Sequence, residues 1–268
     1  MDAETALVLF GSAQLAQRVL GPTLDYLGEG MKQWAEKRVE NIRRIIENAD
    51  KKLGESADIK VPVPPRVLKG IIDEGSFCEE QVATDYLGGV LASSKTGVSR
   101  DDRGATLVAL IARLSTYQLR SHYIFYSTAQ SLLVGLDENI GDPAARTRHG
   151  RIFVPFSVYV PAMEFESGED PDAILSHVLT GLEAEELIEG MWRFGPVEYL
   201  RSVAHGVKEA GIVLQVSLTG IELFLWAHGL GHLGRGTFFD PSQSFETDIP
   251  ISLQGGSVKI ADLKSASD

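Results

Sequence analysis

Two glycine-containing motifs are the first residues of this chain to test for chemistry. Residues 89–96, GVLASSKT, differ by one position from a phosphate-binding P-loop, because Ser94 stands where the second glycine is needed. A predicted helix precedes this motif, and Gly97 interrupts the helix that should follow it. GLGHLG at 229–234 matches the dinucleotide-binding pattern but follows a predicted helix instead of a strand. We predict that neither motif binds a nucleotide, and that 229–234 is the glycine-rich end of a helix.

His228 and His232 are four residues apart, with Glu222 nearby as a third candidate metal ligand. The intervening glycines disfavour a continuous helix there, and His228 lacks the following glutamate of a zinc-protease helix. We therefore predict a structural histidine pair. His122, close to two tyrosines, is predicted to be a helix-surface or core residue. The remaining histidines fall into no recognisable metal-binding spacing: His149, His177 and His205.

Cys78 is the only cysteine, which excludes an internal disulfide and a cysteine-rich zinc site. It lies at a predicted helix start, where a thiolate is favoured, but we interpret it as a small buried apolar residue. No G-x-S-x-G motif occurs, so a hydrolase nucleophile is unsupported. The sequence thus indicates no catalytic, cofactor-binding or metal-binding residue. We expect a non-enzymatic protein without a cofactor, although the sequence leaves an activity open.

The elements that would position these residues are organised around 77–133. Large apolar residues recur at helical spacing on both sides of the polar, glycine-containing segment 94–104. We predict two helices that pack antiparallel as a hairpin across this loop. The residues assigned to its inner face are Val82, Tyr86, Leu87, Val90, Leu91, Leu107, Leu110, Ile111, Leu114, Leu119, Tyr123 and Tyr126.

Residues 29–54 form the most regular predicted helix, with charged residues of both signs opposite one continuous apolar stripe. We expect its interleaved charges to be solvated rather than to bind phosphate. Residues 5–28 are apolar and are interrupted by Pro22; we expect them to pack on the core, with membrane-surface and oligomer-forming roles as alternatives. The stripe comprises Met31, Trp34, Ala35, Val39, Ile42, Ile45, Ile46, Ala49 and Leu53.

The second half of the chain changes character at residue 151, where β-branched and aromatic residues become frequent. Asp170 and Pro171 form a helix start, as an N-cap and a first helical residue. In chain order we predict a linker at 55–66, a short helix at 66–74, a loop at 134–150, one or two edge strands at 151–165, a helix from 171, a second helix at 181–190, a short helix at 196–206, a strand at 211–218, a buried helix at 218–229 and a hairpin at 251–260 about Gly255-Gly256.

The charge is uneven along the chain. Residues 136–268 contain twenty acidic and nine basic residues, a net of −11 out of −12 for the whole chain. Such a field repels nucleic acid at long range. The longest apolar run, Leu107–Ala112, is too short to span a bilayer, and the start MDAET is acidic where a secretory signal is basic. We therefore expect a cytoplasmic protein, and we do not expect nucleic acid to be its partner.

Several segments together resemble the abortive-infection alpha (Abi-alpha) family of bacterial proteins. They are ENIRRIIENADKKLGE, EEQVATDYLGGVLASS, LVALIARLSTYQLR, HVLTGLEAEELIEG and VSLTGIELFLWAHG, and the resemblance covers roughly residues 20–230. Two apolar patterns of the C-terminal part match at Gly181, Leu182, Leu187 and Ile188, and at Leu218, Thr219, Glu222 and Leu223. The resemblance implies a winged-helix-like C-terminal arrangement and a role in defence against phage, and it carries no catalytic residues to transfer.

We therefore expect a mainly α fold with a smaller α+β winged-helix-like C-terminal region. The expected domains are 1–135, a helical domain built on the hairpin, and 150–268, the α+β region. The expected function is phage defence through a protein partner or through self-assembly into a homo-oligomer. Two alternatives remain: a nucleic-acid-binding regulator that uses the winged-helix-like region, against which the acidic 181–190 segment argues, and a membrane-acting effector that uses residues 5–28.

Overall fold

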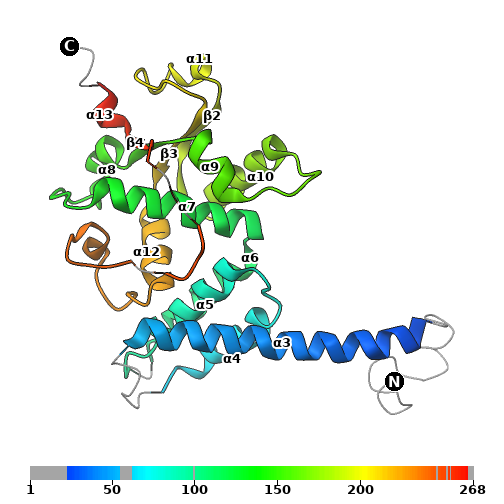
Figure 1. Ribbon diagram of the computed structural model, residues 1–268. Coiled ribbons are helices and arrows are strands. Elements are labelled where there is room, and N and C mark those ends of the chain that lie inside the picture. Colours follow the sequence, from blue (N-terminus) through cyan, green and yellow to red (C-terminus); the bar gives the residue numbers. More distant parts are fainter. Residues whose placement is uncertain are drawn as a thin grey trace.

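The computed structural model is 57% helical and contains one small antiparallel sheet of four strands, so the prediction of a mainly α fold is confirmed (Figure 1). The residues that the structure describes are 23–54, 62–98, 100–245, 247–251, 253 and 255–264. Within these ranges, side chains are described from Lys37 to Leu263. The apolar segment 5–28 therefore lies largely outside the described residues.

Three helices form one end of the molecule. Helix α3 (Thr23–Leu53) is the longest, and its C-terminal half packs mainly against α5 (Gln81–Ser93). Its N-terminal half extends past the other described helices (Figure 1). Helix α4 (Pro65–Gly75) agrees with the predicted short helix and contacts α3 and α5. Its first residue is a proline, which is favourable there because that N–H has no partner within the helix.

Only part of the predicted apolar stripe of α3 is buried, and its members Met31, Trp34 and Ala35 lie outside the residues whose side chains are described. Ile45 and Ala49 are buried against the rest of the protein. Val39 and Ile46 are 70% and 53% exposed. A helix advances 100° per residue, so an apolar stripe this wide exceeds the contact that one neighbouring helix can cover.

The second helix of the predicted hairpin is two helices, α6 (Arg103–Arg113) and α7 (Thr116–Leu133). They are separated at Ser115, whose hydroxyl accepts from the backbone N–H of Gln118 while the Gln118 side chain accepts from the backbone N–H of Ser115. This capping box satisfies N–H groups that a new helix leaves without partners, so a second start is stable here. Helix α5 contacts both α6 and α7, and all three contribute residues to the main core.

Two further predictions between residues 134 and 165 are corrected. The predicted loop contains α8 (Pro143–His149), which Asp142 caps by accepting from the backbone of Ala144. The predicted edge strands are one strand, β1 (Arg151–Pro155), followed directly by α9 (Phe156–Met163). Strand β1 is an inner strand, and its proline is tolerated because it stands at the strand end.

The helix that begins after Asp170 continues further than predicted. Helix α10 (Pro171–Ala184) includes Gly181, and strand β2 (Ile188–Gly195) begins within the predicted 181–190 helix, which is therefore wrong. Gly181 does not break the helix, and it lies close to α7, where a Cβ on it would lie 1.8 Å from Nε2 of Gln118. The chain turns instead at Glu186, which has a left-handed φ of 56°.

The remaining elements complete the sheet, whose strand order is β2-β3-β1-β4. The central strand β3 (Gly211–Val216) is buried along its whole length, and α12 (Leu218–Ala227) follows it as predicted. The predicted hairpin about Gly255-Gly256 is wrong, since β4 (Val258–Lys259) pairs with β1. The short helices α11 (Val197–Leu200) and α13 (Ile260–Lys264) pack against these strands, and the turn η2 (Arg235–Phe239) packs against α12 and α7.

The hydrophobic core is shared by both halves of the chain. One cluster of buried residues extends from Ile45 on α3 to Ile249 after η2. Helix α12 contributes most to this continuity, because it contacts α5 and α7 as well as η2 (Figure 1). The division into domains 1–135 and 150–268 therefore stays a prediction, because residues of both segments belong to one core. Among the described helices, none combines the length and apolarity that crossing a bilayer requires.

Candidate ligand-binding site

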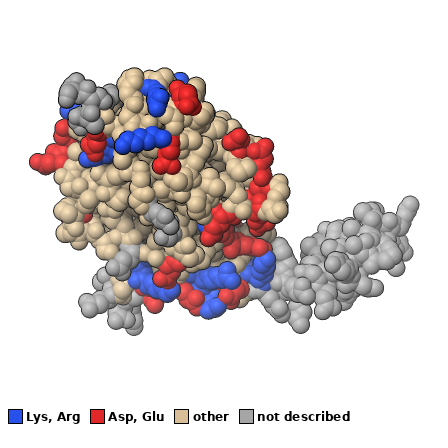
Figure 2. Space-filling model, turned by 45° about the horizontal axis from the view of Figure 1, so that its top comes forward, with Lys and Arg blue, Asp and Glu red and all other residues tan. Residues whose placement is uncertain are grey.

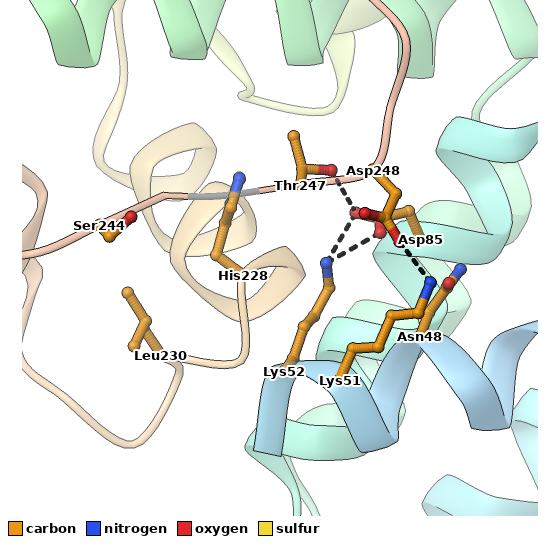
Figure 3. Close-up of a pocket in the computed structure, with 9 residues that line it drawn as sticks. All are labelled: Asn48, Lys51, Lys52, Asp85, His228, Leu230, Ser244, Thr247 and Asp248. Atoms are coloured by element: carbon orange, nitrogen blue, oxygen red, sulfur yellow. Dashed lines mark hydrogen bonds and ion pairs between the residues drawn. The ribbon is translucent and has the colours of Figure 1, made fainter. Parts of the chain in front are cut away.

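A cavity of about 570 Å³ opens where the first and second halves of the chain meet. Its walls come from the C-terminal end of α3, the middle of α5, the end of α12, and Ser244, Thr247 and Asp248 (Figure 3). The volume lies within the usual range for small-molecule sites, roughly 300–1,000 Å³. The lining residues are Asn48, Lys51, Lys52, Asp85, His228, Leu230, Ser244, Thr247 and Asp248.

A buried ion pair forms one wall of this cavity. Nζ of Lys52 on α3 lies 2.9 Å from both carboxylate oxygens of Asp85 on α5, and the two side chains are only 8% and 6% exposed. The Thr247 hydroxyl donates a third hydrogen bond to Asp85, at 3.3 Å. Burial raises the pKa of Asp85 even though Lys52 acts in the opposite direction. Both charges are therefore buried away from water, and each is compensated by the other.

His228 provides the second distinctive group of the cavity. Its Nδ1 donates to the backbone carbonyl of Phe224, at 2.8 Å, because a carbonyl oxygen can only accept. Burial lowers the pKa of His228 to about 4, so the ring is neutral at physiological pH. Nε2 is therefore a bare acceptor, and it is buried without a hydrogen-bond partner. Figure 3 shows the ring standing between Lys52 and Ser244.

Ser244, Thr247 and Asp248 form the wall of the cavity that comes from the C-terminal part of the chain. Asp248 forms an exposed ion pair with Lys51 at the rim, and its backbone carbonyl accepts from Nε2 of Gln81, at 2.9 Å. Ile249, the next residue, is buried in the core. These contacts attach Asp248 to α3 and α5, so the cavity exists only when both halves of the chain are folded together.

The glycine motifs are placed in structural contexts that do not resemble nucleotide sites. Most of residues 89–96 lie in α5 and its C-terminal turn, where Ser94 is buried and donates to the carbonyl of Val90, at 2.7 Å. Residues 229–234 follow the end of α12, and Gly229 has a φ of 79°. The interpretation of this second motif as the glycine-rich end of a helix is confirmed.

The candidate metal ligands are not brought together. His232 is exposed while His228 is buried, and Glu222 forms an ion pair with Arg235. Within the described ranges, no group of three or more histidine, cysteine, aspartate or glutamate side chains is arranged to hold a metal ion.

His122 and Cys78 both take part in packing. His122 is fully buried and is hydrogen-bonded at both ring nitrogens, to the Tyr86 hydroxyl at 2.8 Å and to the Gly220 carbonyl at 3.2 Å. The core alternative for His122 is therefore correct. Cys78 is half-buried and packs against the main core, and burial raises its pKa.

The sequence did not identify Lys52 and Asp85 as residues of a site, and it did not indicate that His228 lines the same cavity. Asp85 lies among apolar residues of α5, which is buried on every side from Val82 to Ser93, and a carboxylate in such a sequence is the one available signal. The partner of such a carboxylate cannot be identified from local spacing, because Lys52 is 33 residues away. No protein-family model, curated protein or solved structure gives a match to this chain.

Proposed function

We propose that this chain is a bacterial phage-defence protein that acts by binding a protein partner or a second copy of itself. The resemblance of residues 20–230 to the abortive-infection alpha family is the reason for assigning defence. The two C-terminal patterns of that resemblance meet in one place, which supports treating them as a unit. The carbonyl of Leu187 accepts from the Tyr126 hydroxyl at 2.5 Å, and Ser217, the residue before Leu218, donates its N–H to the same hydroxyl at 2.9 Å.

The observation that carries a binding role is a group of exposed apolar side chains at the α3–α4 end. We call it the α3–α4 apolar group; it lies on two contacting helices and the turn after α4. Phe77 is the largest of these side chains, is 57% exposed, and lies under the guanidinium of Arg38 at 4.1 Å. We propose that these side chains together form one interaction surface, because large exposed apolar side chains that gather in one place are typical of such a surface. The members are Val39, Ile46, Leu68, Ile72 and Phe77.

We also propose that the segment from α7 to β3 is a winged-helix-like unit. Its elements follow in the order α7, α8, β1, α9, α10, β2, α11 and β3, with β3 between β1 and β2 in the sheet. This order supports the proposal, with α10 at the position of a recognition helix and the 196–210 connection as the wing.

Charge argues against nucleic acid as the partner of this unit. The exposed positions of α10 include Asp172 and Glu183, and none of its residues is Lys or Arg. On α3, the exposed Arg43 is paired with Glu40 and Glu47. In Figure 2, basic side chains (blue) and acidic side chains (red) lie next to each other along the lower edge of the molecule. A nucleic-acid site needs unpaired cations in a continuous patch, so we favour a protein partner.

The experiment is a phage challenge of bacteria that express the chain, compared with an empty vector, across a panel of phages. We expect fewer plaques for at least one phage, and loss of this protection in Ile72→Glu, which places a charge in the α3–α4 apolar group. Met191→Glu on β2 is the matched control, because Met191 is 55% exposed and lies elsewhere. Protection that is absent for every phage contradicts the defence role, and full protection by Ile72→Glu contradicts the surface.

Light scattering and pull-down from infected cells distinguish self-assembly from a separate partner. A mass above that of one chain that falls in Ile72→Glu identifies self-association. A captured protein that is lost in Ile72→Glu and kept in Met191→Glu identifies a partner. A gel shift at physiological salt tests the alternative regulator role, and a sub-micromolar affinity for duplex DNA would replace the protein-partner proposal.

A further inference from the structure

Two rows of apolar residues meet in the α3–α4 apolar group. The meeting point is Gly75 of α4 and Ile42 of α3, since a Cβ on Gly75 would lie 3.8 Å from Cδ1 of Ile42. Each of these two residues is three, four or seven positions from the exposed apolar residues of its own helix, so it shares a helix face with them. The two rows therefore border one continuous surface. Their exposed members are Val39 and Ile46 on α3, and Leu68 and Ile72 on α4.

The charges beside this surface are balanced by neighbouring charges of the opposite sign. Arg43 of α3 is paired with Glu40 and Glu47, and Lys69 of α4 is paired with Asp73. The whole chain carries a net charge of −12, of which residues 136–268 carry −11. Most of that acidic half lies away from α3 and α4, at the other end of the molecule (Figure 1). Two copies of the chain therefore repel each other least when their α3–α4 ends meet.

The length of α3 is a second reason to expect a copy of the same chain on this surface. The helix has 31 residues, roughly 46 Å at 1.5 Å per residue, and its N-terminal half extends past the other described helices (Figure 1). A helical segment of about 15 residues is marginal in water unless it packs against another element. A second α3 that runs antiparallel beside the first, with a two-fold axis near Ile42, places each N-terminal half along the C-terminal half of the other helix.

We infer that the α3–α4 apolar group binds a second copy of this chain in a two-fold symmetric dimer. The two α3 helices lie side by side in opposite directions, their apolar rows meet near the axis, and the two acidic halves face away from each other. A two-fold contact closes after two copies, because the same surface is used on both. This inference rests on the binding role proposed for the surface, and it selects the second copy over a separate protein.

Analytical ultracentrifugation of the full chain, from about 1 to 200 μM, tests for the dimer. We expect a reversible monomer–dimer equilibrium with a Kd below about 50 μM, and at least about tenfold weaker association in Val39→Glu. Val39 is 70% exposed, so this substitution places like charges in the interface without disturbing the core. Met191→Glu, at an exposed position of β2, should associate as the unchanged protein does. A chain that stays monomeric, or a dimer that Val39→Glu leaves unchanged, overturns the inference.

Distances between spin labels test the arrangement of the two copies. Cys78→Ser removes the native thiol, and a single cysteine is then introduced either by Lys69→Cys on α4 or by Ser202→Cys. Ser202 is exposed and follows α11, at the opposite end of the molecule from α4 (Figure 1). We expect a shorter distance between the two labels of a dimer at position 69 than at position 202. Equal distances, or a shorter one at position 202, mean that the copies meet through another surface, which overturns the inference.

Both measurements use purified protein without phage, so their outcome is separate from that of the phage challenge. A monomer whose α3–α4 apolar group still captures a separate protein overturns the inference and leaves the proposed function standing. A dimer formed by a chain that protects against no phage leaves the inference standing and contradicts the defence role.

Discussion

Gly89 of α5 lies directly against the backbone of Ala227 at the end of α12, so closely that a Cβ on Gly89 would be 1.9 Å from the Ala227 carbonyl oxygen. This contact joins a helix of the first half of the chain to the last turn of a helix of the second half. It also sets the distance between Asp85 and His228, because each is within four residues of the contact. The site therefore depends on a close approach that only glycine permits.

We predict that Gly89→Ala destabilises the protein although alanine is the better helix former. The helix preference favours alanine by about 1 kcal/mol, but the new methyl group would overlap backbone atoms that cannot move independently. Overpacking of this kind costs about 1–3 kcal/mol or more, so we expect a net loss of unfolding free energy in urea. Gly234→Ala is the control, because a Cβ there meets nothing within 4 Å. Equal stability of the two variants would contradict the close contact.

We predict that Asp85→Asn lowers the unfolding free energy by roughly 3–5 kcal/mol. The substitution leaves the charge of Lys52 buried against a neutral amide, and removal of one partner of a buried pair has this effect. Asp248→Asn breaks the exposed pair with Lys51 and should change stability by less than about 1 kcal/mol. Chemical denaturation of the two variants gives the comparison. A loss in Asp85→Asn as small as in Asp248→Asn would mean that Lys52 reaches water.

We predict that Tyr126→Phe costs about 1–3 kcal/mol. The hydroxyl donates to the Leu187 carbonyl and accepts from the Ser217 N–H, and both partners are buried contacts between α7 and the second half of the chain. The variant leaves these backbone groups without their partner, which costs their desolvation energy. Tyr199→Phe, at a half-exposed tyrosine, should change little. Thermal or urea unfolding measures both, and a neutral Tyr126→Phe would show that water replaces the hydroxyl.

We predict that stability falls as the pH decreases from about 6.5 to about 4. The pKa of His228 is lowered to about 4 by burial, so in this window the unfolded chain binds a proton that the folded chain does not. Proton uptake by the unfolded state alone favours unfolding, by up to about 3 kcal/mol for a shift of this size. His122, whose pKa burial lowers to about 3, adds to the same effect.

The check is the pH dependence of urea unfolding in the unchanged protein and in His228→Phe. The slope between pH 6.5 and 4 should be shallower in the variant, whatever its absolute stability. His232→Phe should keep the full slope, because His232 is exposed. Identical slopes in all three proteins would mean that His228 titrates normally.

The sequence by itself determined the elements whose signals are local. Asp170 and Pro171 predict the start of α10, and the structure has the helix there because an N-cap and a first-turn proline act on adjacent backbone groups. The inner-face assignment of Leu87 and Leu110 is also correct, since helical spacing alone selects that face. Ser115 and Gln118 contain the signal for the break between α6 and α7, although the prediction joined the two helices.

Only the tertiary structure decided which part of the apolar stripe of α3 is buried, and whether residues 188–190 are helix or strand. Val39 and Ile45 are equally apolar, and the position of α5 selects one of them for the core. Residues 188–190 belong to a strand because β3, which lies far along the chain, offers them a hydrogen-bonding edge. The same reason applies to the cavity. Lys52, Asp85 and His228 come from three separate helices and helix ends, and their proximity depends on long-range packing that no local pattern encodes.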